Sequence, residues 1–130
     1  MKVIIIILNV CIVLFSCNTT KCKVDADFST TFKKMLSQID TDMKKQNGLS
    51  GNSVRSLFYL IELTNVNSKA IIGDLSYYEK LSDYKTDKRK WKQWYEQNKC
   101  LITKNHSNQI MEEVIQSTKW MDTPTSSTTN

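Results

Sequence analysis

The sequence has few residues that break secondary structure. Only three glycines and one proline occur among its 130 residues, and Pro124 lies close to the C-terminus. This scarcity argues against a sheet of many short strands and favours long helices. Histidine is equally scarce, since His106 is the only one. No pair of histidines can therefore share a metal ion, and we predict neither a metal nor another cofactor.

Signatures of the common catalytic sites are missing from the sequence as well. The chain has no glycine-rich phosphate loop and no Ser/His/Asp signature. The adjacent Glu112 and Glu113 would point in different directions on a helix, unlike a catalytic carboxylate pair. Asp83, Asp87 and Glu96 could meet near two tryptophans, although a solvated helix face is the ordinary explanation for them. We predict that the protein is not an enzyme.

The longest apolar run lies at the beginning of the chain. Residues 3–16 are apolar except for Asn9 and Ser16, and Lys2 precedes them. This run is shorter than the roughly 20 residues that a membrane-spanning helix needs. A basic start, an apolar core and a small residue at its end are typical of an export signal. Residues 1–16 are therefore predicted to be a signal peptide, with an uncleaved membrane anchor as the alternative.

The residues that end this run resemble the lipobox of bacterial lipoproteins. Leu14, Ser16 and Cys17 match that motif, while Phe15 replaces the usual small or β-branched residue. The resemblance is to a small, Bacteroidetes-like envelope lipoprotein. It implies that Cys17 becomes the first residue and carries acyl chains such as palmitate, anchoring the protein to a membrane. The implied location is the periplasmic side of the outer membrane, and a secreted protein without lipid is the alternative.

The four cysteines divide into different roles on this interpretation. Cys11 lies within the signal and Cys17 carries the lipid, which leaves Cys22 and Cys100. An exported protein lies in an oxidising compartment, so these two are predicted to form a disulfide. The bridge would close a loop of about 78 residues, which the chain-entropy model values at roughly 4 kcal/mol. A bridge between Cys17 and Cys22 would instead leave Cys100 unpaired.

The remaining chain is predicted to be one small all-α domain. Residues 17–27 are interpreted as a lipidated N-terminus and tether, residues 28–121 as a helical domain, and residues 122–130 as a disordered tail. The first helix has the clearest apolar stripe, with Asp25 or Asp27 as its cap and Asn47-Gly48 as its stop. Its stripe consists of Phe28, Phe32, Met35, Ile39 and Met43.

Three further helices complete the prediction of about four. They cover residues 53–65, residues 86–99 with Thr86 as the cap, and residues 107–121. Residues 65–85 are interpreted as one long ordered loop, with a short helix through Leu75, Tyr78 and Leu81 as the alternative. His106 is placed in a polar turn, and the short segment 100–103 is expected to be extended. The predicted core contains Phe32, Ile39, Leu57, Phe58, Ile61, Trp91 and Trp94.

Residues 50–103 also resemble the helical unit of bacterial HEAT-like repeat proteins and small envelope lipoproteins. The resemblance rests on the residues Leu63, Thr64, Trp91, Trp94, Tyr95, Asn98 and Lys99. It implies that a Trp-x-x-Trp helix packs against a helix ending in Leu-Thr. There is no second copy of the unit, so a solenoid is not predicted. The resemblance implies a packing scheme and no catalytic residue.

The formal net charge of +5 favours acidic partners. An exported location argues against nucleic acid, which leaves acidic envelope polymers and lipid head groups. A candidate aromatic and basic binding face consists of Trp91, Trp94, Lys88 and Lys92. The alternative is that the lysines form a solvated face over a tryptophan core.

These observations predict a membrane-anchored lipoprotein of the bacterial cell envelope with a non-catalytic interaction or scaffold role. Its partner would be an unidentified envelope protein or polymer. The alternative is an inhibitor or immunity-type protein that binds a secreted toxin or hydrolase. An enzyme acting on cell-wall sugars would need a cleft with paired carboxylates, which the sequence does not indicate.

Overall fold

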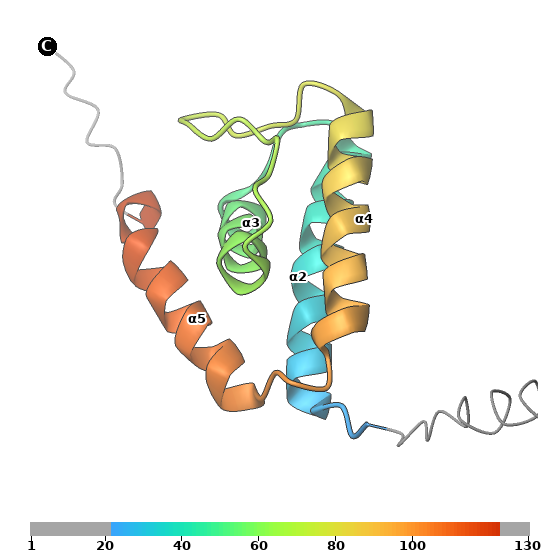
Figure 1. The fold of residues 1–130 in the computed structure, drawn as a ribbon. Helices are drawn as coiled ribbons and strands as arrows, with labels where there is room; N and C mark the ends of the chain where they lie inside the picture. The colour runs from blue at the N-terminus through green and yellow to red at the C-terminus, as the bar shows by residue number, and fades with distance from the viewer. Residues whose placement is uncertain (1–21, 123–130) are drawn as a thin grey trace, which may run out of the picture.

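A computed structural model describes residues 22–122. Its elements are α2 (Ala26–Lys45), α3 (Gly51–Thr64), α4 (Leu81–Asn98), α5 (Lys104–Ser117) and the short 3₁₀ helix η1 (Lys119–Asp122). Helix α3 lies between α2 and α5, while α4 runs beside α2 on the other side (Figure 1). The all-α prediction is confirmed.

Helix α2 begins and ends at local signals that the sequence contains. The Asp25 carboxylate accepts hydrogen bonds from the backbone N–H groups of Asp27 and Phe28, at 3.0 and 3.1 Å. Asp25 is therefore the N-cap, one of the two predicted candidates. At the other end Gln46 and Gly48 have positive φ angles of 58° and 83°. The predicted stop is close, but the left-handed residue that ends the helix is Gln46.

The core forms around α3, as its apolar composition predicts. Phe32, Ile39, Leu57 and Trp91 are fully buried, as expected, and Tyr59 joins them. Phe58, Ile61 and Trp94 were expected in the core but lie at its edge, partly exposed. Phe58 falls on the arc of α3 that also carries Arg55 and Glu62, which explains its exposure. The remaining buried apolar residues are Phe28, Met35, Leu36, Leu49, Val54, Leu60, Leu63, Tyr78, Tyr84, Tyr95, Ile110 and Val114.

Helix α4 begins earlier than predicted, at Leu81 instead of after Thr86. Thr86 lies inside the helix, where its hydroxyl donates to the Ser82 carbonyl at 2.9 Å. Burial explains the longer helix, because Tyr84 lies in the core with its ring edge against Tyr78, the centroids 5.4 Å apart. Residues 65–80 form the long ordered loop.

The C-terminal part of the domain also begins earlier than predicted. Helix α5 starts at Lys104 with Thr103 as its cap, so His106 lies in the first helical turn and not in a polar turn. Leu101 lies in a turn, its N–H donating to the Asn98 carbonyl, so segment 100–103 is only partly extended. The chain then continues from α5 into η1.

The domain is slightly longer at both ends than the predicted range 28–121. Residues Asp25 to Asp27, assigned to the tether, cap and begin α2. Asp122, assigned to the tail, ends η1 and forms an ion pair with Arg55. The predicted signal peptide, Cys17 and tail residues 123–130 lie outside the described residues.

Candidate functional site

A disulfide between Cys22 and Cys100 closes one end of the domain. Their Cα atoms are 5.7 Å apart, within the range that a disulfide requires. The pairing is the predicted one, and it joins the segment before α2 to the turn after α4. Asp25 strengthens this end, since its carboxylate accepts a hydrogen bond from the Lys104 backbone at 2.9 Å. The segment that leads to Cys17 therefore leaves the domain at a cross-linked end.

The structure does not bring the four residues of the predicted aromatic and basic face to one surface. Trp91 is fully buried, so its ring is not available to a ligand, and Trp94 is only partly exposed. Lys88 forms an ion pair with Asp40 at 2.6 Å, while Lys92 is exposed. The reason is helical geometry, since α4 turns Trp91 toward the core and Lys88 and Lys92 toward its solvent edge.

Asp40, Tyr84 and Lys88 form a polar cluster between α2 and α4. The Lys88 ammonium donates to both Asp40 carboxylate oxygens at 2.6 Å, and the Tyr84 hydroxyl donates to one of them. Burial by itself would raise the pKa of Asp40, but the hydrogen bonds from Lys88 and Tyr84 outweigh it and lower that pKa. This cluster ties α2 to α4.

A second polar cluster surrounds Asp87, which is fully buried in α4. One carboxylate oxygen accepts hydrogen bonds from the Ser68 hydroxyl, the Lys69 backbone and the Tyr78 hydroxyl, at 2.9, 2.7 and 3.2 Å. The other oxygen and the Trp91 indole N–H have no hydrogen-bond partner among the described residues. Asp87 therefore ties the long loop to α4.

The acidic residues that could have formed a catalytic site make separate structural contacts instead. Asp83 pairs with Lys69 and Glu96 pairs with Lys99, while Asp87 binds the loop. Asp83 and Asp87 therefore contact the loop, and the solvated helix face expected for them is wrong for Asp87, which is fully buried.

Positive charge gathers along α2 and α4, on a surface that we call the basic face. Lys33 and Lys44 lie three turns apart on one side of α2. Lys85, Arg89 and Lys92 follow at spacings of four and three residues, on the edge of α4 beside Lys88. Lys88 contacts Asp40 of α2, so these two rows border the same seam. The basic face consists of Lys33, Lys44, Lys85, Arg89 and Lys92.

Apolar side chains gather at the opposite end of the molecule from the disulfide, where the long loop folds back on itself. Ile71 and Tyr77 pair through two backbone hydrogen bonds of 2.8 and 3.0 Å. A hollow of about 480 Å³ beside this turn includes Leu75, Tyr77 and Leu81 in its lining. Large exposed apolar residues define what we call the hairpin patch: Ile71, Ile72, Leu75, Tyr77 and Leu81.

The spacing of the α4 cations could have revealed the basic face from sequence. The hairpin patch offered no such signal, because "AIIGDLSYY" has neither a helical nor a strand period.

Comparison with known proteins found no match to this chain. No protein-family model, curated protein or solved structure matches it. Within residues 22–122, no helix is long and apolar enough to cross a membrane. The same part of the chain contains no group of three or more potential metal ligands. The lipoprotein and HEAT-like resemblances remain predictions from the sequence.

Proposed function

We propose that this protein is a lipid-anchored, non-catalytic interaction protein of the bacterial envelope. In this proposal Cys17 holds it to a membrane, and the hairpin patch binds an envelope protein through an apolar segment of that partner. The observation that carries the proposal is the position of the hairpin patch. Five large apolar side chains are exposed at the end of the domain farthest from the Cys22–Cys100 disulfide.

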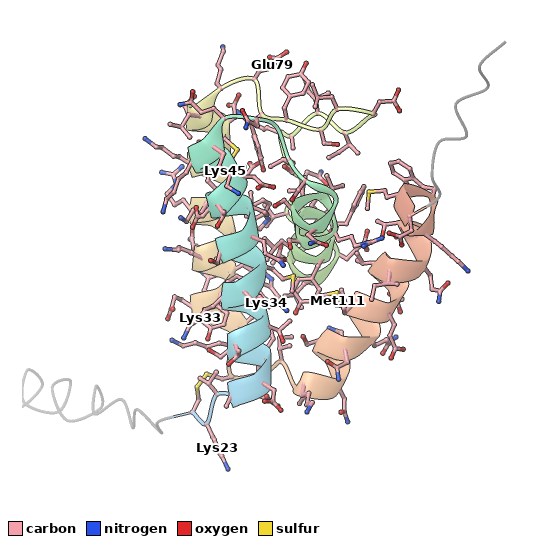
Figure 2. All side chains as sticks on the ribbon, turned by 180° about the vertical axis from the view of Figure 1, so that it is seen from behind. Lys23, Lys33, Lys34, Lys45, Glu79 and Met111 are labelled. Atoms are coloured by element: carbon pink, nitrogen blue, oxygen red, sulfur yellow. A yellow bond between two sulfur atoms is a disulfide. The ribbon has the colours of Figure 1, made fainter. Side chains whose placement is uncertain are left out.

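The anchor part of the proposal is supported by the lipobox-like residues and by the disulfide. Disulfides persist in exported proteins and are rare in reducing compartments. The bridge lies at Cys22, five positions after Cys17. Lys23 marks this end of the domain and Glu79 the opposite one (Figure 2). Helix α2, with 20 residues and a length of about 30 Å, separates the two ends.

The partner part of the proposal is supported by the composition of the patch and its border. Exposed apolar groups that cluster on a soluble surface commonly mark interaction sites. Leu75 is 65% and Leu81 51% exposed. Asp74, Glu79 and Lys80 lie beside them in the loop and are also exposed. An apolar centre with a charged border is typical of a surface that binds another protein.

The anchor is tested by labelling cells with a fatty-acid analogue. Wild-type protein should carry the label, and Cys17→Ser should not, because the acylated sulfur is missing. Cys11→Ser is the matched control and should leave the label unchanged. Equal labelling of wild type and Cys17→Ser would refute the anchor.

The patch is tested by cross-linking in intact envelopes, followed by mass spectrometry. Leu75→Asp should abolish the cross-linked partner, because a charge is placed in the apolar centre. Leu101→Asp is the control, since Leu101 is 75% exposed but lies next to Cys100 at the other end. Loss of the partner with both variants, or a cross-link only between copies of this chain, would contradict the proposal.

A further inference from the structure

The cations of α2 and α4 are largely without acidic partners. Three carboxylates of these helices already have partners. Asp40 forms an ion pair with Lys88 and Asp83 with Lys69, while Asp42 accepts hydrogen bonds from the Ser50 hydroxyl and backbone N–H. Among the described residues, no ion pair includes the cations Lys33, Lys34, Lys44, Lys45, Lys85, Arg89, Lys90 and Lys92. The basic face therefore presents positive charge that the domain itself does not neutralise.

Among the described residues, the exposed carboxylates that are free of ion pairs lie outside α2 and α4, and two of them, Asp74 and Glu79, are in the long loop. Glu112 and Glu113 are exposed on α5, and Glu62 is exposed on α3. None of the three belongs to an ion pair within residues 22–122. Because most of α3 lies between α5 and α2, Glu112 and Glu113 are on a different side of the domain from the basic face (Figure 1). Figure 2 shows Lys33, Lys34 and Lys45 along α2, with Lys33 on the side where α4 lies. An anionic surface would thus favour one orientation of the molecule.

The short connection to Cys17 brings this face close to a bilayer. Cys17 and Cys22 are five positions apart, and a fully extended chain of five residues spans at most about 17 Å. Cys22 lies just before α2 and is bridged to Cys100 in the turn after α4. Lys23 follows directly and is exposed. The nearest residues of the basic face, Lys33 and Lys92, lie about two helical turns from this end of α2 and α4. With a connection of five residues, they can reach the head groups around the anchor.

We propose that the basic face lies on the anionic head groups of the membrane that carries the anchor. This inference rests on the lipid anchor proposed above, and it adds an orientation: α2 and α4 lie along the membrane and α5 faces away from it. A lipid chain combined with a basic patch is a known physical route to stable membrane association. A groove for an extended polymer fits less well, because Ser37 and Thr41 lie between the lysines of α2 and the Trp91 ring is buried.

The test measures membrane binding without the lipid. The chain from residue 17 onward, carrying Cys17→Ser, retains the disulfide-closed core of residues 22–122. It is sedimented with vesicles of phosphatidylcholine alone or with about 30% phosphatidylglycerol. We expect binding to the anionic vesicles only. Raising the ionic strength from about 0.05 M to about 0.5 M should remove it, because salt screens exposed charges.

Two variants that lose the same number of charges separate the basic face from net charge. The first carries Lys33→Gln, Lys44→Gln, Lys85→Gln and Lys92→Gln. The control carries Lys69→Gln, Lys90→Gln, Lys104→Gln and Lys119→Gln, which remove cations from outside the basic face. All these side chains are exposed, so both variants should keep the helical circular dichroism spectrum of the parent chain. The first should bind anionic vesicles at least about tenfold more weakly, and the control should stay within about twofold of the parent.

Three results would overturn the inference. If the two variants lost equal affinity for anionic vesicles, net charge alone would drive the binding. Binding to neutral vesicles would point to apolar insertion. Tight binding to soluble dextran sulfate without binding to anionic vesicles would show that the basic face binds an anionic polymer and not a membrane. None of these results bears on the fatty-acid labelling, so the anchor and this inference can fail separately.

Discussion

At the scale of single residues, burial determines which of two similar tryptophans contributes more to the stability of the fold. Trp91 and Trp94 lie three positions apart on α4, and the sequence predicts both in the core. Trp91 is fully buried, but Trp94 lies at the edge of the core. Trp91 is therefore expected to contribute more to stability than Trp94.

Trp91→Ala should lower the free energy of unfolding by about 3–5 kcal/mol, because a large cavity would remain in the core. Trp94→Ala, the matched change, should cost roughly half as much or less, because its ring is already partly in water. Guanidinium denaturation followed by circular dichroism measures both. Equal losses would show that the two rings contribute alike.

The buried tyrosines make the folded state less stable at alkaline pH. Burial is the main cause that raises the pKa of Tyr59, Tyr78 and Tyr84 above the ordinary value of 10.0. In Tyr84 the adjacent Asp40 carboxylate raises it further. The unfolded chain then loses these protons at a lower pH than the folded chain, so the folded state loses stability as the pH rises above 10.0.

Urea denaturation should therefore show a falling midpoint between about pH 9 and about pH 11. Tyr59→Phe removes one of these groups and should make the fall shallower. Tyr77→Phe is the control, since Tyr77 is exposed in the hairpin patch. A midpoint that does not change over this pH interval would contradict the raised pKa of the buried tyrosines.

At the scale of elements, the long loop is ordered by a helix that follows it in sequence. Asp87 accepts hydrogen bonds from the Ser68 hydroxyl and the Lys69 backbone at the start of the loop and from the Tyr78 hydroxyl near its end. Leu49 adds a backbone contact, its N–H donating to the Ser76 carbonyl at 2.7 Å. The hairpin patch thus depends on α4 for its position.

Asp87→Ala should release this loop, because three donors lose their shared acceptor. We expect a cost of about 1–3 kcal/mol and faster proteolysis within residues 65–80. Asp74→Ala, a change at an exposed loop carboxylate, should leave the cleavage rate near that of the wild type. Limited proteolysis with mass spectrometry distinguishes the two. An unchanged cleavage pattern in Asp87→Ala would show that apolar contacts alone order the loop.

At the scale of the whole molecule, one disulfide connects the segment before the first described helix to the turn after α4. The bridge spans 78 positions, so it constrains most of the unfolded chain. Replacing Cys22 and Cys100 by serine should lower the free energy of unfolding by about 2–4 kcal/mol.

Chemical denaturation of the double variant measures this cost, and wild-type protein treated with a reductant should show the same loss. A double variant as stable as the oxidised wild type would mean that the bridge mainly positions the N-terminal segment.

Local sequence signals determined the helical character of the domain and its disulfide pairing. The apolar stripe of α2, the Asp25 cap and the scarcity of glycine and proline act over a few residues, so they can be recognised without a structure. The cysteines could be paired because only Cys22 and Cys100 remained once Cys11 was assigned to the signal peptide and Cys17 to the lipid. These inferences need no knowledge of which helices touch.

Contacts between segments distant in sequence decided where α4 begins, which residues enter the core, and which surfaces form. Burial of Tyr84 against Tyr78 extended α4 to Leu81, and the packing of α3 placed Phe58 outside the core and Tyr59 inside it. The hairpin patch and the seam bordered by the basic face likewise exist only because loop, α2 and α4 meet in space. Side chains at these positions take their surroundings from tertiary packing, which local propensity and periodicity do not contain.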